Sequence, residues 1–101
     1  MAEINIKDLD FGHQSVVIPD NVMIRKVADE AVILNLQSTQ YFGLDEVGTR
    51  MWEVLTAENT IQDAFELLLA EYDVDPERLS ADLQELVSKL VEQELLELRA
   101  V

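Results

Sequence analysis

The chain has 101 residues, with 7 Lys and Arg against 21 Asp and Glu, a formal net charge of −14 and no cysteine. This length suits one domain, and the lack of cysteine excludes a disulfide framework, a thiolate metal site and a cysteine nucleophile. An acidic surface repels phosphate backbones, so nucleic acid is not an expected partner. No run reaches the roughly 18 apolar residues of a membrane helix, and we expect a cytoplasmic protein without membrane contact.

The first part of the chain, residues 1–21, has a mixed pattern and is expected to form an N-terminal arm. Within it, Ser15–Ile18 has the composition of a short strand. Pro19, Asp20 and Asn21 follow as a turn, because proline fixes φ and the Asp and Asn side chains bond nearby backbone.

Three β-prone runs follow, at Val22–Val27, Glu30–Leu36 and Thr39–Leu44. They predict a three-stranded antiparallel meander with its first and third strands as edges. Alternation in the second run places Ala31, Ile33 and Asn35 on one face and Val32, Leu34 and Leu36 on the other.

After Gly43 the apolar period changes from 2 to 3.6, which predicts three helices. Their expected N-caps are Asp45, Thr60 and Asp75, and Pro76 suits a first helical position. The expected apolar stripes are Val47, Met51, Val54 and Leu55, then Ile61, Ala64, Phe65, Leu68, Leu69 and Tyr72, then Leu79, Leu83, Leu86, Val87, Leu90 and Val91. The last helix is expected to reach about Glu94, with Leu95–Leu98 either extending it or folding back as a strand. The fold class is therefore α+β.

The residues assemble no catalytic or metal site. His13 is the only histidine, and without a second His or a Cys it cannot anchor the usual zinc site. Asp73, Asp75 and Glu77 alternate like the opening of a calcium loop, but Arg78 stands where that loop needs glycine. We therefore expect no enzyme, no catalytic residue, no metal and no cofactor.

The open edge of the third strand is the more informative feature. It offers a row of N–H and C=O groups to an incoming extended peptide. The apolar arc of the last helix is wide enough to contact the core on one side and a ligand on the other. The alternative, which the pattern alone favours, is that this arc belongs wholly to the core.

Two stretches carry a family resemblance. One runs from Leu34 to Gly48, includes the string Tyr41-Phe42-Gly43-Leu44-Asp45-Glu46-Val47-Gly48, and is followed by Trp52-Glu53-Val54-Leu55. The other is Glu71-Tyr72-Asp73-Val74-Asp75-Pro76, with Asp82 ahead of the leucine-rich helix. From about Val22 to Leu96, the sequence resembles the PqqD family.

The resemblance implies a winged-helix-like domain, with a three-stranded antiparallel sheet followed by three helices, at residues 22–98. In that family the leader of a ribosomally made, modified precursor peptide adds as a strand to the third strand, against the third helix. The leader is then presented to a maturation enzyme, often a radical SAM protein, for products such as pyrroloquinoline quinone or lasso peptides. The implied peptide-binding residues are Thr39, Gln40, Tyr41, Phe42, Gly43 and Leu44 on the strand and Leu83, Val87, Leu90 and Val91 on the helix.

Two positions depart from the family pattern. The family usually has glycine where Thr39 stands, and a β-branched residue resists positive φ, so a different turn is expected. It also commonly has glycine where Glu94 stands, so we expect the last helix to run on or to end without a left-handed cap.

Two alternatives remain open from the sequence. One is a winged-helix regulatory or structural interaction domain, although an acidic last helix repels DNA because Glu77, Asp82, Glu85 and Glu92 face only Arg78 and Lys89. The other concerns assembly, since the open edge strand or the N-terminal arm suits a homodimer.

Overall fold

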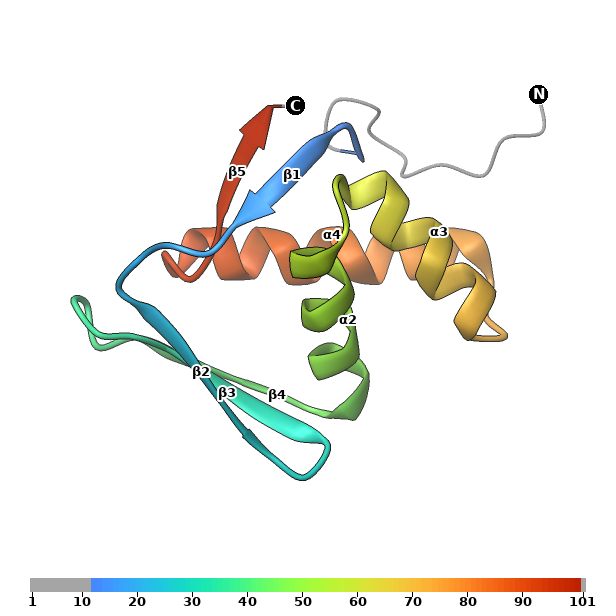
Figure 1. Cartoon of the computed structure of the whole chain (residues 1–101). Coiled ribbons are helices and arrows are strands. Elements are labelled where there is room, and N and C mark those ends of the chain that lie inside the picture. The colour runs from blue at the N-terminus through green and yellow to red at the C-terminus, as the bar shows by residue number, and fades with distance from the viewer. Residues whose placement is uncertain (1–11, 101) are drawn as a thin grey trace.

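The computed structural model describes residues 12–100. Its elements are, in chain order, β1 (Gln14–Val17), β2 (Val22–Val27), β3 (Glu30–Asn35), β4 (Tyr41–Leu44), α2 (Glu46–Ala57), α3 (Ile61–Glu71), α4 (Pro76–Glu92) and β5 (Glu97–Ala100). Figure 1 shows α2 and α3 lying across the long α4, with one sheet below the helices and a two-stranded ribbon above them. The predicted α+β class, with three helices after a three-stranded antiparallel sheet, is confirmed.

The three-stranded sheet has the order β2-β3-β4, and a separate antiparallel pair joins β1 to β5. Of the two alternatives for Leu95–Leu98, the fold-back strand is therefore the one that forms. The pairing sets Gln14 opposite Ala100 and Val17 opposite Glu97, so residues 14–17 of the expected arm are tied to the end of the chain. Residues 1–11 of that arm lie outside the described residues.

One face of the sheet packs on the helices. Ala31, Ile33 and Asn35 are buried and alternate with more exposed neighbours, as the pattern of β3 predicts. The apolar side chains that meet there are Ala31, Ile33, Leu44, Trp52, Leu90, Leu95 and Leu96. A second cluster, centred on Phe65, Leu68, Leu83 and Val87, holds the three helices together.

The predicted N-caps are confirmed. Asp45 accepts a hydrogen bond from the Gly48 N–H at 2.8 Å, and Thr60 accepts one from the Asp63 N–H at 3.0 Å. Asp75 caps α4 in the same way, and Pro76 occupies the start of that helix. These bonds satisfy backbone donors that the first turn of a helix leaves without partners.

The end of α4 corrects one expectation. The helix stops at Glu92, and Glu94 adopts a left-handed conformation with φ of 63°. The Leu95 N–H bonds the Leu90 carbonyl at 2.8 Å, and the Glu94 N–H bonds the Val91 carbonyl at 3.0 Å. This is the Schellman pattern of a left-handed cap. The prediction that α4 runs on or lacks such a cap is wrong, because the bonds and the burial of Leu95 hold Glu94 where glycine would fit more easily.

The turn before β4 also differs from the expectation, which was that Thr39 would change the turn. Thr39 has φ of 61°, so a β-branched residue stands in the left-handed region. Its N–H bonds the Asn35 carbonyl at 2.8 Å, which closes the turn. The turn therefore keeps the positive φ that glycine would favour, and the paired strand begins at Tyr41 rather than at Thr39.

A chain of ion pairs links the sheet to the helices. Arg50 on α2 donates to both carboxylate oxygens of Glu71 on α3, at 2.7 and 2.8 Å, and also contacts Glu53 at 3.3 Å. Lys26 on β2 pairs with Glu53. Hydrogen bonds from Arg50 lower the pKa of Glu71, while Lys26 and then Arg50 lower the pKa of Glu53.

We expect Glu94→Gly and Thr39→Gly each to stabilise the fold. A non-glycine residue in the left-handed conformation costs the folded state roughly 1–2 kcal/mol, which glycine would remove. The greater entropy of glycine in the unfolded chain offsets roughly 0.5–1 kcal/mol of this stabilisation. Thermal unfolding should therefore shift upward by a few degrees. Glu92→Gly, at a helical position of the same segment, is the control and should lower the midpoint. A lower midpoint for Glu94→Gly would contradict the account of the cap.

We expect the ion-pair chain to stabilise the protein at neutral pH and to lose this effect in acid. The folded-state pKa values of Glu53 and Glu71 are lowered, so their contribution is present above the ordinary carboxylate pKa and is lost as the pH falls through the lower, folded-state values. Urea unfolding of Arg50→Met should show lower stability than the wild type at pH 7 and a shrinking difference towards pH 3. Arg78→Met is the control, because Arg78 only meets exposed Asp82 at 3.9 Å.

Candidate functional site

The open edge of β4 is the first candidate surface. Within residues 12–100, β4 pairs with β3 alone, with Ile33 opposite Phe42 and Leu34 opposite Tyr41. The Asn35 N–H bonds the Gln40 carbonyl at 2.8 Å. Hydrogen-bonded and non-bonded pairs alternate along an antiparallel ladder. It follows that Phe42 and Leu44 bond towards β3, whereas Tyr41 and Gly43 direct their N–H and C=O groups away from it.

The side chains leave that edge accessible. Leu44 is buried and Phe42 is half-buried against the sheet cluster, while the Tyr41 side chain is 70% exposed on the opposite face. A Cβ built on Gly43 would meet no atom within 4 Å. The backbone groups at Tyr41 and Gly43 can therefore be approached by another extended chain.

Most of the α4 residues that the resemblance implied as peptide contacts are buried in the core. Leu83, Val87 and Leu90 are 0% exposed and belong to the core clusters, so in this structure they present no surface to a ligand. Val91 is half-buried and lines a pocket at the end of α4. Most of the apolar arc of α4 therefore belongs to the core, as the alternative interpretation predicts. Leu86 and Val91, which are half-buried against both clusters, are the side chains of the arc that keep some surface.

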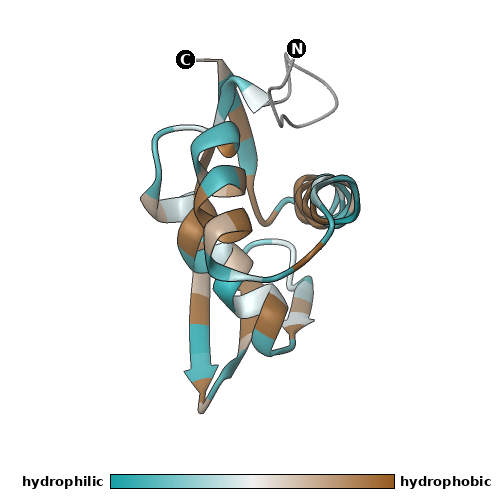
Figure 2. Ribbon diagram, turned by 90° about the vertical axis from the view of Figure 1, so that its right-hand side faces the viewer, coloured by the Kyte–Doolittle hydropathy of each residue, from teal (hydrophilic) through white to brown (hydrophobic). Residues whose placement is uncertain are grey.

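The edge of β4 and the helix α4 lie on the same side of the molecule. Figure 2 views α4 end-on, with the arrow of β4 beneath it and that of β2 on the other side. Phe42 on β4 and Leu86 on α4 pack against the same cluster, which contains Leu90 and Leu95. Half-buried apolar side chains from both elements therefore meet in this cluster.

Asn35 is a residue that the sequence argument left without a role. It is 2% exposed, and its side-chain oxygen accepts hydrogen bonds from the Gln37 and Ser38 N–H groups and from Asn21 Nδ2, each at 2.9 Å. Its side-chain nitrogen donates to the Glu94 carbonyl at 2.8 Å. The signal in the sequence was an amide at an inward position of an otherwise apolar alternation.

A second surface is the outer face of the sheet. Several of its side chains are exposed and apolar, namely Met23, Val27, Val32, Leu36 and Tyr41. A shallow hollow of about 300 Å³ lies over Val32 and Gly43, beside Arg25. This face runs without interruption to the free edge of β4.

Neither a metal centre nor a membrane segment emerges from residues 12–100. In that range no group of three or more His, Cys, Asp or Glu could hold a metal ion. No helix within it is long and apolar enough to cross a membrane.

Comparisons with known proteins agree on one family. Residues 30–96 match the family described as Coenzyme PQQ synthesis protein D (PqqD). The structure of TbiB1 in complex with the TbiA(beta) leader peptide is 39% identical and superimposes with a TM-score of 0.73, covering 79% of this chain and 93% of that one. A lasso peptide synthetase B1 complexed with its leader peptide, 19% identical, shows the same fold with a TM-score of 0.73, covering 82% of this chain and 98% of that one.

No curated protein matches the sequence. The family match nevertheless spans about two-thirds of the chain and contains β3, β4 and all three helices. The chain belongs to the PqqD family.

Proposed function

We propose that this protein is a non-catalytic binding domain for the leader segment of a ribosomally made, modified precursor peptide. The leader adds as a strand to the open edge of β4, beside α4. The observation that carries this proposal is the pair of outward-facing backbone positions, Tyr41 and Gly43, on an edge to which no strand of residues 12–100 pairs. Backbone pairing supplies affinity in such complexes, and nearby side-chain pockets supply selectivity.

The comparisons support the same ligand class. TbiB1, 39% identical, is in complex with a leader peptide, and a second protein of the same fold is also complexed with one. The sequence positions proposed for contact are Thr39, Gln40, Tyr41, Phe42, Gly43 and Leu44, with Leu83, Val87 and Leu90 supporting the site from the core and Val91 at the end of α4.

The proposed role includes delivery to a cytoplasmic maturation enzyme, such as a radical SAM protein or another enzyme of peptide modification. Holding the leader raises the effective concentration of the attached core peptide near the enzyme. Pyrroloquinoline quinone synthesis is one such pathway. The charge of −14 favours a leader or enzyme with basic residues near the contact. If so, affinity should fall as salt rises.

A DNA-binding role is less well supported. Arg78 and Lys89 on α4 already face Asp82 and Glu85 at 3.9 and 3.3 Å, so the two cations of that helix have acidic neighbours. The homodimer expected from the open edge stays a prediction, and it would compete with a leader for the same backbone groups.

We expect the TbiA(beta) leader peptide to bind this protein saturably in isothermal titration calorimetry. Hydrogen exchange of the bound complex should show slower exchange at the Tyr41 and Gly43 amides, because each would gain a carbonyl partner. The amides of Phe42 and Leu44, which already face β3, are the internal control and should change little. No heat and no protection at millimolar peptide would contradict the proposal.

Tyr41→Pro should weaken leader binding about tenfold or more, since it removes an outward N–H from the edge. Unfolding in urea should change less than for Phe42→Pro, which removes an N–H directed at β3. Tyr41→Ala separates loss of the side chain from loss of the N–H and should bind more tightly than Tyr41→Pro. Equal affinities for Tyr41→Pro and the wild type would show that the leader uses another surface.

A further inference from the structure

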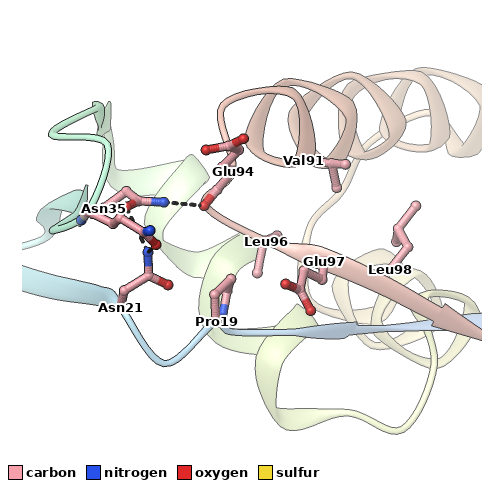
Figure 3. A pocket seen from close by; sticks show the side chains of 9 residues that line it. Pro19, Asn21, Asn35, Val91, Glu94, Leu96, Glu97 and Leu98 are labelled. Carbon is pink, nitrogen blue, oxygen red and sulfur yellow. Dashed lines mark hydrogen bonds between the residues drawn. The ribbon is translucent and has the colours of Figure 1, made fainter.

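The side chain of Asn35 connects the turn before β4 to the cap of α4. Asn35 is the last residue of β3, and the five residues after it lead into β4. Its Nδ2 donates to the carbonyl of Glu94, the residue that ends the cap of α4, at 2.8 Å. Figure 3 shows this bond, with Asn35 lying between Asn21 and Glu94. This bond ties the turn that leads into β4 to the cap of α4, in addition to the apolar packing between the sheet and the helix.

The same amide also holds the turn. Its oxygen accepts from the Gln37 and Ser38 N–H groups, and the Asn35 backbone bonds both Thr39 and Gln40 at 2.8 Å. Two residues next to these bonds, Thr39 and Glu94, hold φ values of 61° and 63°. Residues in such sparsely populated conformations persist only where the surrounding bonds over-determine them.

We propose that Asn35 is a positioning residue for leader binding: its amide sets the separation between the edge of β4 and α4 that an added strand requires. The inference rests on the proposed function. Its physical basis is that the oxygen and the nitrogen of the Asn35 side chain have different hydrogen-bond partners. The oxygen organises the turn and the start of β2, whereas the nitrogen alone reaches α4. A substitution that changes only the nitrogen can therefore separate positioning from folding.

Asn35→Asp is that substitution. The carboxylate keeps an oxygen for Gln37, Ser38 and Asn21 but loses the N–H donor and places negative charge against the Glu94 carbonyl. With the TbiA(beta) leader peptide as the probe, we expect Kd at pH 7.5 to rise about tenfold or more for the folded protein. Asn21→Ala is the matched control, because it removes a donor from the oxygen side only, and its Kd should stay near that of the wild type.

A pH series adds a signature that general destabilisation does not give. Burial and the facing Glu94 carbonyl raise the pKa of an acid at position 35, against the opposite effect of the N–H donors on its other oxygen. The protonated acid again has an O–H to donate to the Glu94 carbonyl, so the ratio of variant to wild-type Kd should fall towards one as the pH is lowered through the pKa of that acid. Glu94 and Glu97 are the charged residues that line the adjoining pocket of about 640 Å³, and they are present in both proteins, so the ratio isolates residue 35.

The outcomes separate the two proposals. Failure of the wild type to bind the probe would contradict the proposed function itself. A wild type that binds, with Asn35→Asp binding equally well or Asn21→Ala weakened to the same degree, would overturn the positioning role alone. If Asn35→Asp does not fold, hydrogen exchange of the wild-type protein still tests the positioning role. Saturating probe should slow solvent exchange of the Asn35 side-chain amide protons if the bond to Glu94 is part of the bound state, and unchanged exchange would count against it.

Discussion

A buried amide at the end of β3 joins the sheet to the last helix, and the rest of the architecture depends on that junction. A small sheet of three strands must bury one face to be stable, and here the burial comes from α2 and from the end of α4. The Schellman cap at Glu94 turns the chain so that Leu95 and Leu96 reach the sheet. Asn35 then ties the carbonyl of Glu94 to the turn before β4. Removing a buried polar partner costs more than the bond itself contributes, because the orphaned group stays desolvated.

The proposed peptide-binding surface is the edge of the sheet that this packing leaves uncovered. The helices cover one face of the sheet, β3 occupies one side of β4, and no described element covers the other side. An edge with unpaired backbone groups invites uncontrolled association. This protein keeps its edge short, at four residues, and its net charge of −14 opposes the association of further copies. Those features are compatible with capture of one foreign strand rather than growth of a larger sheet.

Two of the three non-glycine residues with positive φ in residues 12–100 lie at this junction, and the third, Ala28, lies in the turn between β2 and β3. Thr39 and Glu94 adopt conformations that glycine adopts without cost, and the stabilising bonds around Asn35 offset that cost. The expectation that a threonine or a glutamate would change the turn or the cap was reasonable from local propensity. It was wrong because tertiary hydrogen bonds and the burial of Leu95 outweigh about 1–2 kcal/mol of local preference at each position. The apolar arc of α4 gives a second example, because its pattern in the sequence does not show which of its side chains are buried in the core.

The sequence alone determined the elements whose signals are local. Alternation in β3, the helix caps at Asp45, Thr60 and Asp75, and the family string around Tyr41–Gly48 required no knowledge of distant contacts. Only the tertiary structure decided the pairing of β1 with β5, the burial of Leu83, Val87 and Leu90, and the hydrogen bonds of Asn35. Each of these depends on partners far away in the chain, such as Asn35 and Glu94. Local periodicity carries no information about which distant groups will meet, and apolar packing and hydrogen bonds between such groups decide which face of an element stays exposed.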